Sequence, residues 1–460
     1  MSSGTRARQR GAIMLGIAGG MLVAAGGLTG AYYVVATRSE ARAATVTQPP
    51  ANDKVHPGAT ASPALTALLA KQVEVTATGT TEKLTWADLG IEVDPGELAR
   101  ITADTADQLT ALGAKAALPV RIDRDKATKQ LLALKAKTDR SPTDAYLDLE
   151  ERKIHTDTPG QGIDVWASLP KIEAAARQGA AKVELVSVPI AAGVTKQTLG
   201  IDDISNVLGH YKTGFPVFDR DRNFNLKLAA SKIDGTVLKP HEEWSFNGQV
   251  GERSEKEGYK IAHVITAGEM VDGLAGGTCQ ISTTLFGAAF FAGLDIVKTT
   301  NHSRPSAYTP LGFDATVVWP DTDLKLKNPY DFPVAIHYRV ANGEAVVEVL
   351  GKPRPYDKIV FARKVLEETP FETDERLDDD MPDGQTSLDQ AGFDGYKLTR
   401  FRRFFQGKKM VREDKWTVNY KPVTEYVRRG TNKDPNAKMP PAKEVHALKA
   451  PSSDEYSMAQ

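Results

Sequence analysis

Hydrophobic and polar residues change their spacing several times along the chain, and each spacing predicts a different element. In Gln72–Gly79 (QVEVTATG) every second residue is apolar at first, which predicts a strand. Further on, Ala127, Leu131 and Leu134 recur every three or four residues, which predicts a helix. Because strands and helices mix in this part of the chain, residues 71–195 are predicted to form one domain of the α+β class.

Four more segments of this domain have patterns of their own. Residues 144–156 are typical of a β-hairpin, and residues 164–180 have the amphipathic spacing of a second helix. Residues 182–190 (KVELVSVPI) are expected to form the closing strand. A short helix is expected over residues 85–91, where Thr85 can cap the first turn and a glycine can end the last.

The next domain, residues 196–352, is predicted to end in a hairpin. Near its end, residues 333–351 read PVAIHYRVANGEAVVEVLG, with two alternating runs on either side of an Asn-Gly pair. Asn342 and Gly343 both tolerate the left-handed angles that tight hairpin turns need.

The C-terminal part is predicted to be rich in strands. Alternation continues through residues 353–430, which are expected to form a small β-rich domain with an acidic loop at Asp374–Asp383. Residues 431–460 are polar and contain prolines, and they are expected to be a disordered tail. The predicted fold class is therefore α+β, multidomain and membrane-anchored, with a β-rich C-terminal domain.

A membrane anchor is predicted within residues 1–40. Residues 12–36 carry no charge and are long enough to cross a bilayer about 30 Å thick, and the arginines before them favour a cytoplasmic N-terminus. The alternative is a cleaved signal peptide, because Ala41–Ala44 (ARAA) resembles a cleavage site. Residues 41–70 include a stretch rich in Pro, Ala and Thr and are expected to be a flexible linker. The expected location is the cytoplasmic membrane, crossed once, with most of the chain on the extracytoplasmic side.

Charge and cysteine content narrow the function classes. The chain has 58 Lys and Arg against 59 Asp and Glu, a formal net charge of -1, so no basic field points to nucleic acid. With one cysteine, the chain cannot form an internal disulfide. A single thiol in an exported protein is either buried and inert or reactive. No cofactor and no metal are expected, and the oligomeric state is left open.

The single cysteine, Cys279, lies between two glycines and an apolar run with helical spacing. Gly276 and Gly277 permit backbone angles closed to other residues and allow close approach by a substrate. A cysteine in the first turn of a helix has its thiolate stabilised by free N–H groups and the helix dipole, and the thiolate is the nucleophile. The same N–H groups could hold a tetrahedral oxyanion. The other interpretation is a small buried hydrophobic residue, which is the commoner role of a lone cysteine.

A base and an acid follow within residues 299–317 (TTNHSRPSAYTPLGFDATV). His302 can take the proton of a thiol and return it to a leaving amine. Asp314 can orient the imidazole, although it could equally cap a turn or pair with Arg304. His263 is the rival base, but its apolar neighbours suggest a buried strand.

The ordered motifs around these residues closely resemble the VanW domain family. The resemblance covers about residues 200–351 and is carried by SFNGQVGER, GGTCQISTTL, NHSRP and GFDATV. One departure is KPHEEW, where the family usually has Pro-Gly-Glu and an aromatic residue; His241 replaces the glycine, so a changed turn is expected before Phe246. Residues 142–175 are similar to a peptidoglycan-binding domain often found before VanW. Residues 353–430 look like a glycine-named β-domain of cell-wall proteins.

The resemblance implies a protein of the bacterial envelope with peptidoglycan as its partner. Some bacterial members of the VanW family have been described as L,D-transpeptidases that use the cysteine of the GG-x-C-Q motif. Carried over, this implies Cys279 as nucleophile, His302 as base and Asp314 as the third group. Other L,D-transpeptidases place their histidine before the cysteine, so the fold of those enzymes is not implied.

The expected function is therefore cysteine-dependent acyl transfer on peptidoglycan stem peptides, with water as acceptor giving a carboxypeptidase. Backbone amides near Gly277 would hold the oxyanion. Substrate contacts are expected from Gly276, Gly277, Gln280, Ser282, Thr283 and Ser303. The alternatives are a non-catalytic peptidoglycan-binding protein, in which the thiol is buried, and an accessory protein of glycopeptide resistance, such as vancomycin resistance, that binds a precursor or a partner.

Overall fold

The computed structural model describes residues 63–99, 117–266, 269–441 and 455–460. The chain divides into two units, Met1–Gly58 and Ala59–Gln460, and all described residues belong to the second. The predicted membrane segment, residues 12–36, lies outside the described residues. Within the described ranges, no helix is both long enough and apolar enough to cross a membrane.

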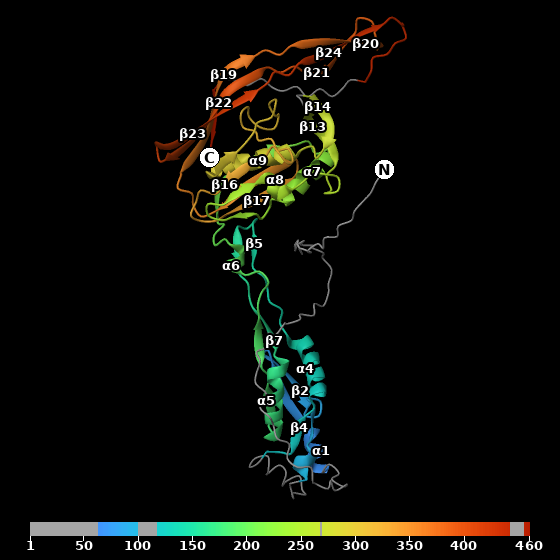
Figure 1. Ribbon diagram of the computed structural model, residues 1–460, viewed down its shortest axis with the longest axis vertical. Helices are drawn as coiled ribbons and strands as arrows, with labels where there is room; N and C mark the ends of the chain where they lie inside the picture. Colours follow the sequence, from blue (N-terminus) through green and yellow to red (C-terminus); the bar gives the residue numbers. More distant parts are fainter. Residues whose placement is uncertain (1–62, 100–116, 267–268, 442–454) are drawn as a thin grey trace, which may run out of the picture. The chain divides into compact units, whose positions relative to one another are not determined.

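The N-terminal region combines a three-stranded sheet with two helices (Figure 1). In the sheet, β1 (Gln72–Ala77) is antiparallel to β2 (Thr80–Thr85) and parallel to β8 (Lys182–Glu184). The helices are α4 (Arg124–Thr138) and α5 (Val165–Arg177). One hydrophobic core joins them, and it includes the alternating residues of β1 and the periodic residues of both helices: Val73, Val75, Ala127, Leu131, Leu134 and Ile172. The predicted strand and both predicted helices are confirmed.

Shorter elements complete this region. They are α1 (Pro63–Leu69), α2 (Pro95–Leu98) and α6 (Lys196–Leu199), with the pairs β3 (Ile91–Val93) and β4 (Val120–Ile122), β5 (Tyr146–Asp148) and β6 (Lys153–His155), and β7 (Gly160–Ile163) and β9 (Ser187–Ile190). The pair β5–β6 is the hairpin predicted from residues 144–156. Helix α1 lies inside the segment expected to be a linker.

Two local predictions in this region are wrong. Residues 182–190 form two short strands, β8 and β9, that belong to different sheets. Residues 85–91 form a turn and not a helix, because Thr85 is the last residue of β2 and its hydroxyl donates to the Asp88 carboxylate at 2.6 Å. The capping contact that suggested a helix start is present, but it closes a turn between two strands.

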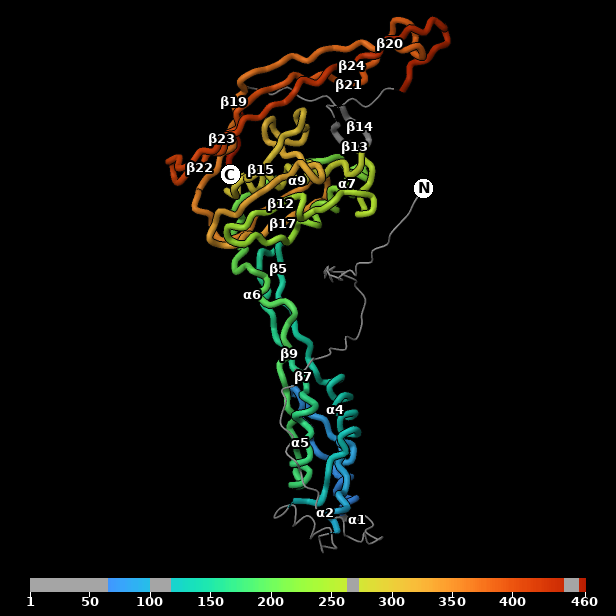
Figure 2. Tube along the Cα trace, viewed as in Figure 1, coloured from blue at the N-terminus to red at the C-terminus, as the bar shows by residue number. Residues whose placement is uncertain are grey.

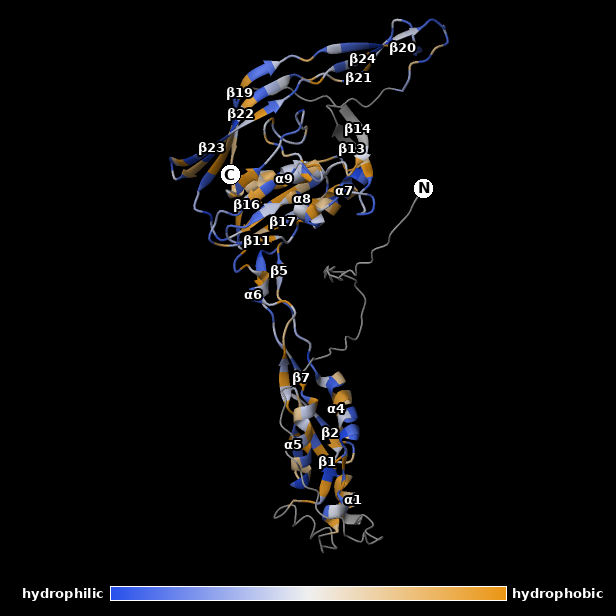
Figure 3. Cartoon of the chain, in the orientation of Figure 1, coloured by the Kyte–Doolittle hydropathy of each residue, from blue (hydrophilic) through white to orange (hydrophobic). Residues whose placement is uncertain are grey.

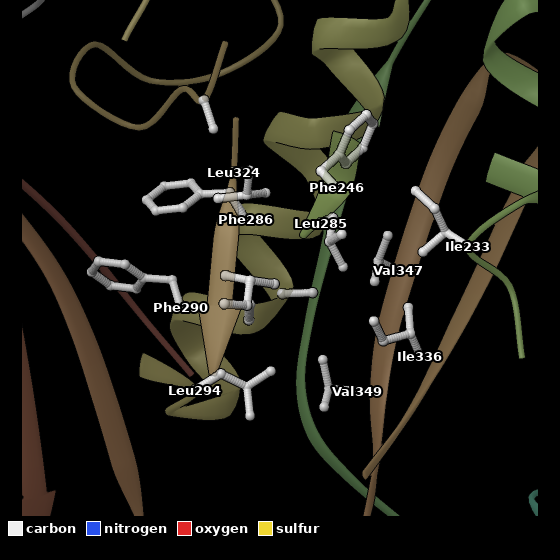
Figure 4. Close-up of a cluster of buried hydrophobic side chains, with 14 of the residues drawn as sticks. Ile233, Phe246, Leu285, Phe286, Phe290, Leu294, Leu324, Ile336, Val347 and Val349 are labelled. Carbon is white, nitrogen blue, oxygen red and sulfur yellow. The ribbon is translucent and has the colours of Figure 1, made fainter. Parts of the chain in front are cut away.

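The central region is built around the buried helix α9 (Thr278–Ala292). This helix packs against a sheet ordered β10-β18-β17-β11. The strands are β10 (Asn206–Gly214), β18 (Glu344–Gly351), β17 (Val334–Ala341) and β11 (Val237–Leu238). Figure 4 shows Leu285 of α9 facing Val347 and Val349 of β18, whereas Phe286 and Phe290 point to the other side of the helix. A helix packed on every side needs apolar or internally bonded residues all round.

Other elements of this region surround α9. They are α7 (Arg220–Ser231), α8 (Phe246–Val250), the hairpin of β13 (Ile261–Thr266) and β14 (Glu269–Leu274), and a sheet of β12 (Glu243–Ser245), β16 (Lys325–Lys327) and β15 (Asp295–Lys298). The hairpin predicted over residues 333–351 is confirmed as β17 and β18. Its turn residues Asn342 and Gly343 have φ angles of 52° and 80°, as tight hairpin turns require.

The turn before β12 contains the histidine that departs from the VanW pattern. His241 has a φ of 61°, in the left-handed region that glycine adopts without strain. For a residue with a side chain this conformation costs about 1–2 kcal/mol. The ring Nε2 lies 2.9 Å from Asp331 Oδ1, so the side chain gains a partner at the surface.

The C-terminal region consists of two sheets. One is ordered β23-β22-β19-β25 and the other β20-β24-β21. The strands are β19 (Lys358–Thr369), β20 (Thr373–Pro382), β21 (Thr386–Gln390), β22 (Gly395–Gln406), β23 (Lys409–Tyr420), β24 (Glu425–Asn432) and β25 (Glu455–Ala459). Figure 2 shows β19 and β22 running side by side, as their antiparallel pairing requires. The predicted β-rich character is confirmed.

Two expectations for this region are wrong in detail. The acidic segment expected as a loop is mostly strand β20, which pairs parallel to β24. Figure 3 shows both strands mainly in the colours of polar residues, and Arg428 of β24 pairs with Asp378 of β20 at 2.9 Å. In the segment expected to be a disordered tail, Glu455–Ala459 forms β25 and pairs with β19.

Candidate active site

Cys279 lies in the first turn of α9, directly after a glycine turn. Gly277 precedes the helix, and its φ of 101° falls in the left-handed region that favours glycine. A Cβ atom at this position would lie 3.2 Å from side-chain atoms of Arg222 and Leu226. The turn therefore requires glycine for both its backbone angle and its packing, and it sets the direction in which α9 begins.

The backbone N–H groups at this helix start differ in their partners. No side chain caps the N-terminus of α9. The Thr278 N–H donates to the Ala275 carbonyl at 3.3 Å, and the Gln280 N–H donates to the Gly277 carbonyl at 2.8 Å. Among the described residues, the Cys279 N–H has no acceptor. A free donor at the positive end of the helix dipole therefore lies at the thiol itself, where it can stabilise an anion.

Cys279 is the one residue of α9 that is not buried. The other fourteen residues of the helix, from Thr278 to Ala292, are all buried, whereas Cys279 is half-buried. Its Sγ lies 3.4 Å from the carbonyl oxygen of Val317. The thiol is therefore held against the segment that follows Asp314 and is still open to a reactant.

His302 and Asp314 form a close pair beside this thiol. The His302 Nδ1 lies 2.6 Å from Asp314 Oδ2, and the same oxygen accepts the backbone N–H of His302 at 2.7 Å. Ser306 Oγ lies 3.2 Å from the same ring nitrogen. Because Nδ1 faces Asp314, Nε2 is the nitrogen left for hydrogen bonding between His302 and Cys279. The structure thus brings together the three residues predicted as nucleophile, base and orienting acid.

The electrostatics of this group favour a thiolate–imidazolium pair. Burial acts to raise the pKa of Cys279, but hydrogen bonding to His302 and its charge outweigh burial, so the pKa of the thiol lies below its ordinary value. Burial acts to lower the pKa of His302. The electrostatic interaction with Tyr308 and hydrogen bonding with Asp314 and Cys279 outweigh burial and raise this pKa well above its ordinary value. Burial opposes ionisation of Asp314 too, yet its bonds with His302 keep its pKa low. All three shifts favour a thiolate and an imidazolium beside an ionised Asp314.

A tyrosine from the C-terminal region completes the group. The hydroxyl of Tyr420, on β23, donates to Asp314 Oδ1. The same hydroxyl accepts the backbone N–H of Gly312 at 3.0 Å. Both the tyrosine and the carboxylate are buried. Sequence reasoning missed Tyr420 because it lies 106 residues after Asp314 and in another predicted domain.

Three residues expected to contact substrate are bonded inside the protein. Gln280 accepts from Arg222 at 2.6 Å and donates to Thr213 and to the β10 backbone. Ser282 donates to the Ala315 carbonyl, and Thr283 bonds both the carbonyl and the N–H of Ala315. All three side chains are buried. In this arrangement they fasten α9 to its neighbours and fix the chain beside Asp314.

The remaining predicted residues have mixed surroundings. Gly276 is buried, and its carbonyl accepts from Asn225 at 3.2 Å. Ser303 is exposed next to His302, and its carbonyl accepts the N–H of Lys421 at 3.0 Å. The rival base, His263, lies on β13 opposite Asp272 in the strand register.

Arg253 and an apolar edge border the thiol. The Arg253 charge also lowers the pKa of Cys279, after burial and His302. Both terminal nitrogens of Arg253 lie 3.0 Å from Asn247 Oδ1, and the Asn247 amide donates to carbonyls between Val318 and Thr322. Val318 is 54% exposed and Trp319 43% exposed. An accessible apolar surface therefore begins one residue after the carbonyl that touches the thiol.

Possible metal ligands lie elsewhere. In the part of the chain that the structure describes, the acidic side chains close enough to share an ion are Asp378, Asp379 and Asp380 on β20. Acidic groups at a surface are common without a metal.

The chemistry available at Cys279 is that of a thiolate, an imidazolium and a backbone N–H, which together suit acyl transfer.

Comparison with known proteins assigns the chain to a family. Residues 221–350 match the family described as VanW like protein. A protein of Bacillus subtilis strain 168, the uncharacterised protein YoaR, is 35% identical over 227 residues, which are 49% of this chain and 74% of YoaR. The chain belongs to the VanW family. The VanW region contains Cys279, His302 and Asp314, and YoaR-like similarity extends beyond it.

Further matches flank the VanW region. Residues 96–184 match the family described as "Putative peptidoglycan binding domain", and residues 362–432 match the G5 domain. The vancomycin B-type resistance protein VanW of Enterococcus faecalis strain ATCC 700802 / V583 is 29% identical over 32% of this chain and 56% of its own length. The G5 domain of an IgA1 protease is 21% identical over 17% of this chain and 98% of that domain, with a TM-score of 0.12, too low to carry an argument. These VanW and flanking matches support a cell-envelope protein with a region of the peptidoglycan-binding type.

Proposed function

We propose that this VanW protein is a cysteine-dependent acyl transferase that acts on peptidoglycan stem peptides and forms L,D cross-links. The observation that carries the proposal is the placement of the bonded pair His302 and Asp314 where the imidazole lowers the pKa of Cys279, the one residue of α9 that is not buried. A buried structural cysteine needs neither an imidazole nor a carboxylate beside it. A nucleophilic one needs both the proton acceptor and the group that orients it.

In the first half-reaction, the Cys279 thiolate attacks the carbonyl carbon of the bond between an L-centre and the following D-residue. A carbon–sulfur bond forms, and the carbonyl oxygen becomes an oxyanion that accepts the Cys279 N–H. The His302 imidazolium gives its Nε2 proton to the nitrogen of the departing D-residue. The carbon–nitrogen bond then breaks, which leaves a thioester on Cys279 and a neutral imidazole.

In the second half-reaction, an amine of a neighbouring stem attacks the thioester carbonyl. His302 takes a proton from that amine, the carbon–sulfur bond breaks, and the thiolate–imidazolium pair is restored beside Asp314. The product is a new amide between two stems. If water replaces the amine, the same steps give a carboxypeptidase, so the acceptor decides between cross-linking and trimming.

The other regions support action at the cell wall. The match of residues 96–184 to a peptidoglycan-binding family supports binding of the same polymer that the thiol would modify. The uncharged run at residues 12–36 supports an anchor in the cytoplasmic membrane, with the catalytic region outside the cytoplasm. The name of the Enterococcus faecalis relative favours a second candidate, an accessory role in vancomycin resistance without catalysis.

The test is mass spectrometry of the purified full chain after incubation with tetrapeptide-containing muropeptides. We expect a covalent adduct on Cys279 and new cross-linked dimers, and we expect both to be lost in Cys279→Ala and His302→Ala. His241→Ala is the matched control, because His241 also pairs with an aspartate at 2.9 Å but lies at the exposed turn before β12. Absence of any adduct and of any change in cross-links with the wild-type protein would favour the accessory role.

A further inference from the structure

The C-terminal β-rich region holds the backbone on both sides of His302. The N–H of Lys421 donates to the Ser303 carbonyl at 3.0 Å. The Asn301 side chain donates to the Asn419 carbonyl at 2.8 Å. The residues before and after the imidazole are therefore bonded to the end of strand β23.

The same region holds the turn that leads to Asp314. Arg363 of β19 donates to the Leu311 carbonyl at 3.0 Å, and Arg400 of β22 donates to the Gly312 carbonyl at 3.4 Å. Both arginines are buried. A buried charged group loses its hydration, and hydrogen bonds inside the protein must offset that cost. The bonds from these arginines to the two carbonyls are therefore costly to break.

Tyr420 lies between these two sets of contacts. Its oxygen already accepts the Gly312 N–H, so its own proton is directed to Asp314 Oδ1. The other carboxylate oxygen, Oδ2, is bonded to the His302 ring and its N–H. Burial, together with the neighbouring Asp314 charge, raises the pKa of Tyr420 well above its ordinary value, so the phenol keeps the proton that it donates.

The packing around Asp314 is also shared between the two regions. Phe313, next to Asp314, has its ring centroid 4.6 Å from that of Phe361 on β19 and 5.1 Å from that of Phe290 on α9. These residues and Phe404 of β22 belong to one buried core that continues into the VanW region. The β-rich region is thus packed into the site and is not joined to it by a linker alone.

We infer that the C-terminal β-rich region is a required half of the active site and that Tyr420 is a positioning residue, which holds Asp314 so that Asp314 keeps the His302 ring directed at Cys279. The inference rests on the proposed function for its catalytic meaning. One part of it can be tested without any assumption about catalysis. The ionisation of the Cys279 thiol should depend on the Tyr420 hydroxyl, which touches neither the thiol nor the imidazole. A module that only binds the wall would leave that ionisation unchanged.

The experiment measures alkylation of the full chain by iodoacetamide between pH 5 and pH 10. In Tyr420→Phe, we expect the rate at the acid end of this range, below the pKa of the thiol, to fall about tenfold, as for a thiol pKa displaced upward by one unit. At pH 10 the rate should match that of the wild type. Tyr396→Phe is the matched control, because Tyr396 is buried in the same cluster but its hydroxyl donates to Glu368 at 3.2 Å. We expect this control to change the rate less than twofold.

A second variant and a second background keep the test decisive. Asn301→Ala removes the bond to the Asn419 carbonyl of β23 and a second bond, of 2.8 Å, to the His302 carbonyl. It is expected to slow alkylation at the same acid pH about threefold, even if Tyr420→Phe fails to fold. In an Asp314→Asn background, Tyr420→Phe should have no further effect, because its influence passes through that carboxylate. A wild-type alkylation profile in a folded Tyr420→Phe, or a further tenfold loss in the Asp314→Asn background, would overturn the positioning role of Tyr420. Wild-type rates in Asn301→Ala as well would overturn the role of the whole β-rich region.

These outcomes are distinguishable from failure of the proposed function. If the wild-type protein forms no adduct with muropeptides but Tyr420→Phe still slows alkylation, the positioning role stands and the acyl-transfer proposal falls. If the wild-type protein is active and Tyr420→Phe keeps both its alkylation profile and its kcat, the positioning role falls and the proposed function stands.

Discussion

Replacing His302 by alanine tests the ionisation of Cys279 most directly. The thiol is half-buried, and burial alone acts against a charged sulfur, so the low pKa of Cys279 depends on hydrogen bonding to His302 and on its charge. Without the imidazole, the remaining favourable charge is that of Arg253, and burial is unopposed by any hydrogen bond from a ring nitrogen. The pKa of the thiol should therefore rise in His302→Ala.

The size of the effect follows from the fraction of thiolate. A thiol with an ordinary pKa of about 8.5 is only about 3% ionised at pH 7, whereas a thiol paired with an imidazolium is mostly ionised there. Alkylation of His302→Ala by iodoacetamide at pH 7 should thus be slower by at least about tenfold. The sign of the pH dependence is fixed as well: the wild-type rate should fall only as the pH drops below the lowered pKa, and the rate of the variant should already fall at higher pH.

The assay is the rate of loss of free thiol, followed by mass spectrometry, in the folded full-length protein. His241→Ala, which removes an exposed histidine, serves as the control for the loss of an imidazole elsewhere. Identical pH profiles for the wild type and His302→Ala would refute the reasoning, because they would mean that the imidazole does not influence the sulfur.

Two other changes near the helix start have defined outcomes. Gly277→Ala should lower the free energy of unfolding by about 2 kcal/mol, from its φ of 101° and contacts at 3.2 Å, and slow alkylation; denaturant unfolding checks this. Gly235→Ala, at φ 78° with nothing within 4 Å, should show only the backbone part, and equal losses would contradict the packing argument. Arg253→Gln should raise the pKa of Cys279 and slow alkylation at pH 6 more than at pH 9. An unchanged ratio of those two rates would show that this charge does not reach the thiol.

Sequence patterns predicted the elements that depend only on the residues close to one another in the chain. Alternation in β1 and the Asn-Gly turn between β17 and β18 are local properties, and both are seen in the structure. The expected helix after Cys279 is also present, but its helical spacing did not predict that it is buried on every side. Burial on every side depends on which distant segments pack around the helix, and the spacing of residues within the helix cannot predict those segments.

The failures have the same origin. The acidic run at residues 374–383 has the composition of a solvated loop, yet pairing with the arginines of β24 makes it a strand. Cys279, His302 and Asp314 could be selected as a group because they lie within 36 residues of one another in recognisable motifs. Tyr420 could not, because a tyrosine at the end of a strand has an ordinary local pattern and gains its meaning from the packing of two regions.

The burial of α9 has a consequence for saturation mutagenesis of this protein. Most replacements along the helix would disturb tightly packed neighbours and reduce the amount of folded protein, so their phenotypes would reflect abundance. Position 279 differs, because its side chain is half-buried and a small replacement there leaves the surrounding packing largely in place. A deep mutational scan should therefore find one position in fifteen where folded protein levels and cell-wall phenotype separate.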